Sequence, residues 1–113
     1  MIKAIFSLNP KTKYIKLTVK GHAGYGKVGE DIICSAATIL ADTVAQIVLD
    51  LDRRGLLREK PLIKRESGNM IIACKPVDYA FDEAIHTYLV AQTGFKLLNH
   101  NFKNYVDVKL FGY

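Results

Sequence analysis

The fold of this chain is decided by its longest periodic segment, residues 31–55, which reads DIICSAATILADTVAQIVLDLDRRG. The segment predicts a helix from Ile32 to about Arg54, because Asp31 is a good N-cap and Gly55 can end a helix in the left-handed conformation. Its polar residues form one narrow stripe: Ser35, Thr38, Asp42, Gln46 and Asp50. We expect such an apolar helix to be covered on most sides, by a sheet and a second helix or by a partner subunit.

Two strands are predicted before this helix. Residues 2–8 alternate between apolar and polar, and residues 14–20 alternate again. The inward positions of the two strands are Ile2, Ala4, Phe6 and Leu8, then Ile15, Leu17 and Val19. The Asn-Pro-containing turn at residues 9–13 joins them into a hairpin.

After the helix, residues 56–66 hold one or two strand-like runs, and the Ser-Gly-Asn turn at 67–69 leads into an apolar strand at 70–74. Asp78 is expected to cap a second helix that runs to about Leu98. The inner face of that helix is predicted to hold Phe81, Ile85, Tyr88, Leu89, Gln92 and Phe95. A last strand is predicted at 105–111, with Val106, Val108 and Leu110 facing inward.

The element order is therefore hairpin, helix, hairpin, helix, strand. This order predicts an α+β fold, with a mixed β-sheet and two main helices, in a single domain over residues 1–113. Half of the residues are hydrophobic, which is enough to build a core without disulfides or metal.

Polar residues interrupt every apolar run before it reaches the roughly 20 residues of a membrane span. The N-terminal residues alternate and lack the continuous apolar stretch of a signal peptide. We therefore expect a cytoplasmic protein with no membrane partner. In that compartment Cys34 and Cys74 argue against a disulfide framework, and either one of them is a reactive thiol or both are buried small residues.

The segment with potential chemistry is residues 21–38, GHAGYGKVGEDIICSAAT. If Asp31 is the N-cap, Cys34 lies in the first helical turn, where free N–H groups and the helix dipole favour a thiolate and could bind an oxyanion. His22 ends the second strand and can act as a base if the loop folds back. These residues alone leave open the commoner alternative, a surface histidine and a core cysteine.

The string Gly21-His22-Ala23, followed by Gly-x-Asp-Ile-Ile-Cys-x-Ala at residues 29–36 and by Thr38, closely resembles the ribosomal-processing cysteine protease family known as Prp. Two positions depart from the pattern, since Ser35 replaces the usual Ala and Thr38 stands where Ser is common. The resemblance implies that His22 and Cys34 form the catalytic pair. It also implies that Asp31 caps the helix first and helps His22 second.

The resemblance further implies a cysteine endopeptidase that removes a short N-terminal extension from large-subunit ribosomal protein L-twenty-seven. Members of the family are small bacterial cytoplasmic proteins that tend to form homodimers through helices. The glycines would let the loop order over the substrate peptide, and the residues expected in this substrate-binding loop and beside it are Gly21, Gly24, Tyr25, Gly26, Gly29 and Thr38. No cofactor, metal or direct nucleic-acid contact is required.

Two other patterns in the sequence are discounted. Residues 24–29 match G-x-G-x-x-G, but the strand before them is half of a hairpin rather than the start of a βαβ unit. A metal site is not expected either, because His22, His86, His100 and the two cysteines lack close ligand spacing. We predict that His86 lies on a helix face, that His100 lies in a turn, and that Cys74 packs in the core.

The alternative to an enzyme is a non-enzymatic ribosome- or RNA-associated module. Its support is the net charge of +5 and the basic stretch at residues 53–65. The sequence shows no RNA-recognition motif with interleaved aromatic residues.

Overall fold

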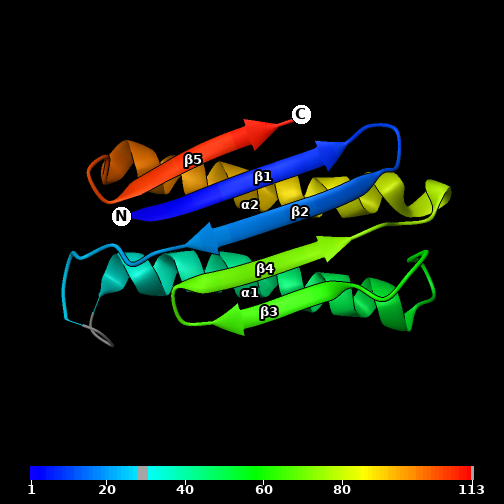
Figure 1. The fold of residues 1–113 in the computed structure, drawn as a ribbon, viewed down its shortest axis with the longest axis horizontal. Coiled ribbons are helices and arrows are strands. Elements are labelled where there is room, and N and C mark those ends of the chain that lie inside the picture. The colour runs from blue at the N-terminus through cyan, green and yellow to red at the C-terminus, as the bar shows by residue number, and fades with distance from the viewer. Residues whose placement is uncertain (28–30, 113) are drawn as a thin grey trace.

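A five-stranded sheet carries two helices on one of its faces in the computed structural model, which describes residues 1–27 and 31–112 (Figure 1). In chain order the elements are β1 (Ile2–Asn9), β2 (Tyr14–Lys20), α1 (Ile32–Arg53), β3 (Leu62–Glu66), β4 (Asn69–Cys74), the 3-10 turn η1 (Asp78–Ala80), α2 (Phe81–Asn101) and β5 (Val106–Phe111). The predicted α+β fold and its element order are confirmed.

The strands lie in the order β3-β4-β2-β1-β5. All neighbouring pairs are antiparallel except β1 and β5, which are parallel because α2 carries the chain across the sheet before β5 begins. The strand that follows α1, β3, runs parallel to β2 but is separated from it by β4, so the glycine-rich segment does not lead between two neighbouring parallel strands. This arrangement differs from the dinucleotide-binding unit, in which the glycine-rich turn joins neighbouring parallel strands.

The core lies between the sheet and the helices. The predicted alternation in the first hairpin is confirmed, because its inward residues are buried or half-buried along both strands. The Phe6 ring from β1 meets the Phe95 ring of α2 edge to face, with 5.9 Å between ring centroids. The Tyr88 hydroxyl donates a hydrogen bond to the Ile72 carbonyl at 3.1 Å, which ties α2 to β4.

Gly94, within α2, permits the close approach of the two helices. A Cβ at this position would lie 2.6 Å from Cδ2 of Leu40 on α1. Glycine is unfavourable inside a helix by roughly 1 kcal/mol relative to alanine, so the close packing of Leu40 accounts for its presence.

The start of α2 differs from the prediction. Asp78 lies in η1 and not at the helix cap, and the N-cap of α2 is Ala80, with no side-chain hydrogen bond. The 3-10 turn moves the helix cap two residues along the chain, from Asp78 to Ala80, and the Asp78 carboxylate pairs instead with Arg58 at 3.1 Å. The helix also continues to Asn101, three residues past the predicted end.

Two predicted core positions are exposed. Leu89 lies at the solvent side of α2, where the smaller Ala84 and Ala91 take the buried positions instead. Leu110 is exposed because β5 is an edge strand whose exposure rises towards its C-terminal end.

Helix α1 begins and ends as predicted to within one residue. The Asp31 side chain caps it, and Gly55 follows with φ of +74°. By length and composition α1 could cross a membrane, with a mean hydropathy of 1.9, which differs from the expectation drawn from its polar interruptions. One side of the helix packs in the core, which accounts for part of this composition, while Ile32, Ile39 and Leu49 on its outer side are exposed.

Candidate active site

Asp31 organises the start of α1 and the loop before it. Its Oδ1 accepts hydrogen bonds from the backbone N–H groups of Ile33 at 2.9 Å and Cys34 at 3.0 Å. Its Oδ2 accepts two more, from Tyr25 at 2.9 Å and Gly26 at 3.1 Å. One carboxylate therefore caps the helix and also fastens the loop to it.

These hydrogen bonds keep the Asp31 carboxylate ionised. The Asp31 pKa is lowered chiefly by the hydrogen bond from the Cys34 backbone N–H; those from Gly26, Tyr25 and Ile33 add to this effect, and burial opposes it. The described hydrogen bonds of the carboxylate all come from backbone N–H groups. The predicted cap is thus confirmed, while help from Asp31 to His22 stays a prediction.

The loop after β2 folds back onto the first turn of α1. The backbone N–H of Ala23 donates to Sγ of Cys34 at 3.4 Å. His22 and Cys34 both line one small pocket of about 50 Å³, whose other lining residues are Ile2, Val19, Gly21, Ala37, Thr38, Gly68 and Met70. An imidazole and a thiol from segments twelve positions apart thus border the same space.

Gly68, in the turn between β3 and β4, lies directly against the His22 ring. A Cβ at this position would be 2.6 Å from His22 Nε2, and Gly68 has φ of +75°. The pairing of Lys20 with Asn69 places the turn there, and the Gly21 N–H donates to the Gly68 carbonyl at 2.9 Å. The sequence marks residues 67–69 as a turn but gives no sign of this contact, because the contact depends on how β2 and β4 pair.

The two cysteines lie in opposite environments. Cys34 is half-buried and borders the pocket, whereas Cys74 is 1% exposed in the core, as predicted. Burial raises the pKa of the Cys74 thiol to about 11, although a hydrogen bond from the Tyr88 hydroxyl partly opposes that rise. Cys34 is therefore the thiol that a substrate or reagent can reach.

The residues predicted for the substrate loop divide into three groups. Gly21 and Thr38 line the pocket beside Cys34. The Gly26 N–H is bound to Asp31, and Gly24 has φ of +70° with open space around it, so both shape the loop. Gly29 lies outside the described residues.

Tyr25 does not line the pocket. Its ring packs edge to face on Phe102, with 5.8 Å between centroids, and on Tyr105, with 5.2 Å. These contacts fasten the loop to the segment between α2 and β5. The predicted contact of Tyr25 with a substrate would require the ring to leave these partners.

The backbone N–H groups of the first helical turn are already used. Those of Ile33 and Cys34 donate to the Asp31 carboxylate, and that of Ser35 donates to the Asp31 carbonyl at 3.0 Å. An oxyanion would therefore have to compete with Asp31 for the N–H groups of Ile33 and Cys34, and its binding there stays a prediction. Ala23 supplies the backbone N–H directed at the sulfur.

Within residues 1–27 and 31–112, no group of three or more His, Cys, Asp and Glu side chains is arranged to hold a metal ion. His86 is exposed on α2, as predicted, and its Nδ1 lies 2.8 Å from the Asp82 carbonyl oxygen. His100 lies in the last turn of α2 rather than in a turn after it, because the helix is longer than predicted.

Replacing Asp31 by asparagine is expected to keep the helix and release the loop. The remaining amide oxygen can still cap Ile33 and Cys34, but the amide NH₂ cannot accept hydrogen bonds from Tyr25 and Gly26. We expect Tm to fall by roughly 5–10 °C. Hydrogen exchange should become faster at residues 24–26 while α1 stays protected, and loss of protection throughout α1 would contradict the division of roles between the two oxygens.

The same substitution tests the acid dependence of stability. Because the folded pKa of Asp31 is lowered, its contribution to stability is present above the unfolded value of 3.8 and is lost as pH falls through the folded pKa. Thermal unfolding of Asp31→Asn should therefore lose less stability than the wild type below about pH 4. Parallel acid profiles for the two proteins would mean that the carboxylate is not stabilised by the fold.

Comparison with known proteins extends the resemblance over nearly the whole chain. The family model of cysteine protease Prp matches residues 1–107. The ribosomal processing cysteine proteases Prp of two Staphylococcus aureus strains are each 32% identical over 108 residues, which cover 91% of this chain and 96% of theirs.

Solved structures share the fold. A crystal structure of an essential ribosomal processing protease Prp from S. aureus, in complex with a covalently linked product peptide, has a TM-score of 0.74 at 21% identity and covers 97% of this chain and 99% of its own. A second, with a substrate peptide, has a TM-score of 0.70 at 19% identity and the same coverage. A Streptococcus mutans protein has a TM-score of 0.69 at 19% identity, over 98% and 94% of the two chains. With the family model and the curated relatives both matched along its length, this chain belongs to the cysteine protease Prp family.

Proposed function

We propose that the chain is a cysteine endopeptidase in which Cys34 is the nucleophile and His22 the base. The observation that carries this proposal is the shared pocket, in which both side chains are lining residues. The Ala23 N–H at 3.4 Å from the sulfur adds support, since it can stabilise the negative charge of a thiolate.

The chemistry follows from these two groups. His22 takes the thiol proton of Cys34, and the thiolate attacks the scissile carbonyl carbon to give a tetrahedral oxyanion. Collapse of that oxyanion breaks the C–N bond, and the imidazolium protonates the leaving amine. Water, deprotonated by His22, then attacks the thioester and releases the acid product and the free thiol.

The substrate in this proposal is the N-terminal extension of large-subunit ribosomal protein L-twenty-seven. The relatives are described as ribosomal processing proteases, and two solved relatives hold a substrate peptide or a covalently linked product peptide. A pocket of about 50 Å³ suits the peptide backbone at the scissile bond, or a small side chain beside it, better than a large side chain.

The test is cleavage of a peptide that spans the extension and its junction with the mature protein. Mass spectrometry should find one cut, and iodoacetamide should abolish it while modifying Cys34 and leaving Cys74 unmodified in the folded protein. The raised pKa of Cys74, about 11, and its burial explain the expected selectivity. No cut in the untreated protein, or full activity after Cys34 is alkylated, would overturn the proposal.

A homodimer formed through the helices is part of the same proposal. The outer surface of the helix layer has an apolar groove of about 270 Å³ lined chiefly by Leu40, Val44, Ile47, Val90 and Ala91. Exposed Ile39 on α1 and Leu97 on α2 add to the apolar surface of the same two helices. If the protein is a dimer, the molar mass measured by light scattering should be twice that of one chain. We also propose a cytoplasmic location, because the proposed substrate is a ribosomal protein.

A further inference from the structure

The basic stretch at residues 53–65 is largely neutralised. Each arginine in it has a carboxylate partner: Arg53 and Arg54 pair with Asp50, Arg54 also with Glu83, Arg58 with Asp78, and Arg65 with Asp42. These pairs join the stretch to the helices and to η1. The excess positive charge of the chain is therefore carried by lysines rather than by these arginines.

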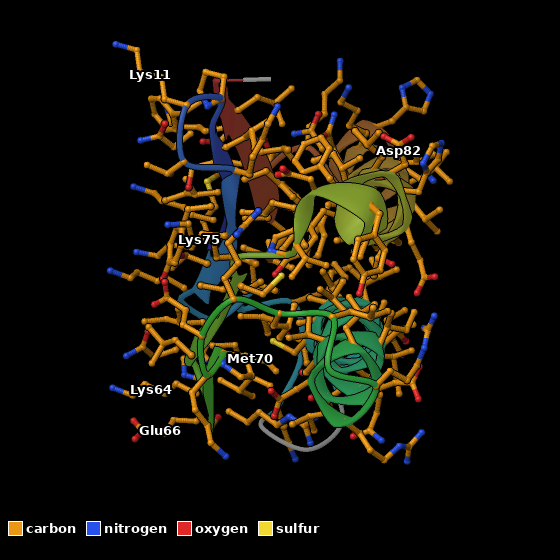
Figure 2. The ribbon with its side chains drawn as sticks, turned by 90° about the vertical axis from the view of Figure 1, so that its right-hand side faces the viewer. Lys11, Lys64, Glu66, Met70, Lys75 and Asp82 are labelled. Carbon is orange, nitrogen blue, oxygen red and sulfur yellow. The ribbon has the colours of Figure 1, made fainter. Side chains whose placement is uncertain are left out.

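Part of this positive charge gathers on the outer face of the sheet, opposite the helices. Strand register places five lysines on this face: Lys3, Lys16, Lys20, Lys64 and Lys109. Figure 2 shows the molecule edge-on, with Lys64 and Glu66 on the side away from the helices and Asp82 on the helix layer. The strand residues that bring negative charge to this face are Glu66 and Asp107.

The lysines of this face are poorly compensated. Of the five, Lys64 alone has an ion pair among the described residues, with Glu66 at 3.7 Å. Lys3 on β1 stands directly opposite Lys20 on β2 and Asp107 on β5, so one carboxylate only partly offsets the repulsion between the two lysines. A multiply charged anion would relieve this repulsion.

One end of the same face holds two aromatic side chains. Tyr14 on β2 and Phe111 on β5 share the outer face with the lysines, and both line an open hollow of about 460 Å³ that Lys11 also borders. Phe111 is 56% exposed. Lysines along a sheet with aromatic rings in a hollow are the two elements with which proteins bind single-stranded RNA.

We propose that this outer face binds single-stranded RNA, with the lysines on phosphates and with Tyr14 and Phe111 against a base. The apolar residues at the centre of the face, Ile5 and Ile71, are half-buried and do not protrude as a membrane-inserting surface would. RNA therefore fits better than an anionic bilayer. The inference goes beyond the proposed proteolysis and stands without it, because the face lies on the opposite side of the sheet from the helices.

The charge contribution is tested by fluorescence anisotropy with a labelled oligouridylate over a series of salt concentrations. For Lys16→Gln/Lys109→Gln we expect about tenfold weaker binding and a plot of log affinity against log salt that is shallower by about 1.4, the value for two lost phosphate contacts. The matched control, Lys96→Gln/Lys103→Gln, removes equal charge from α2 and the residues after it and should bind like the wild type. Equal losses in both double variants would overturn the proposal.

The stacking contribution has its own pair of variants. Phe111→Ala should weaken RNA binding about tenfold with the salt slope unchanged, as expected for one stacked base. Tyr79→Ala, at an 82% exposed aromatic residue of η1, should have no effect. If the protein binds no RNA at low salt, or binds phosphatidylserine vesicles but not RNA, the outer face is not an RNA-binding surface.

Discussion

Cys34→Ala is expected to lower cleavage of the extension peptide by at least about 10⁴-fold, because it removes the sulfur that is the proposed nucleophile. The fold should survive, since Cys34 is half-buried and alanine is a good helix former. Cys74→Ala is the matched control and should keep near wild-type kcat/KM. Cleavage by Cys34→Ala at the wild-type rate would contradict the assigned nucleophile.

The partner of the nucleophile is tested in the same assay. His22→Gln should lower kcat by roughly 10³-fold, because glutamine can neither take the thiol proton nor protonate the leaving amine. Groups that act as one unit are strongly non-additive, so the His22→Gln/Cys34→Ala protein should be no less active than Cys34→Ala. An additive loss would mean that the two side chains act separately.

Gly68→Ala is expected to lower kcat/KM by roughly 100-fold, because the added methyl group would meet Nε2 of His22 at 2.6 Å. The imidazole must then move away, and a displacement of about 1 Å in a catalytic group is enough for such a loss. Cleavage of the extension peptide is the measurement, together with Tm.

Gly55→Ala supplies the control for backbone strain. Gly55 has φ of +74°, nearly the same as the +75° of Gly68, and a Cβ there would meet nothing within 4 Å. Both substitutions should cost about 1 kcal/mol of stability, while only Gly68→Ala should lose activity. Equal activity in the two variants would show that the turn does not position His22.

The fold could be predicted well because its local signals agree. The alternation of Ile2, Ala4 and Phe6 predicts a strand, and the cap at Asp31 predicts the start of a helix. The structure contains both elements. The second helix was placed less well, since η1 intervenes before Phe81 and no local signal separates a 3-10 turn from a first helical turn.

The candidate site could be predicted in part. His22, Cys34 and Asp31 stand in one motif, so the sequence names them together. Gly68 and Met70 reach the same pocket through the pairing of β2 with β4, a long-range contact that leaves no mark near either residue. The ring contacts of Tyr25 could not be predicted from the sequence either, because its partners Phe102 and Tyr105 are more than seventy positions away along the chain.

The pocket around Cys34 draws on residues from Ile2 to Met70. During synthesis, thiol and imidazole leave the ribosome well before the hairpin that carries Gly68 can pair with β2. A nascent chain therefore carries its reactive groups without the surroundings that align them. We therefore expect the proposed proteolysis to begin only once that hairpin has docked.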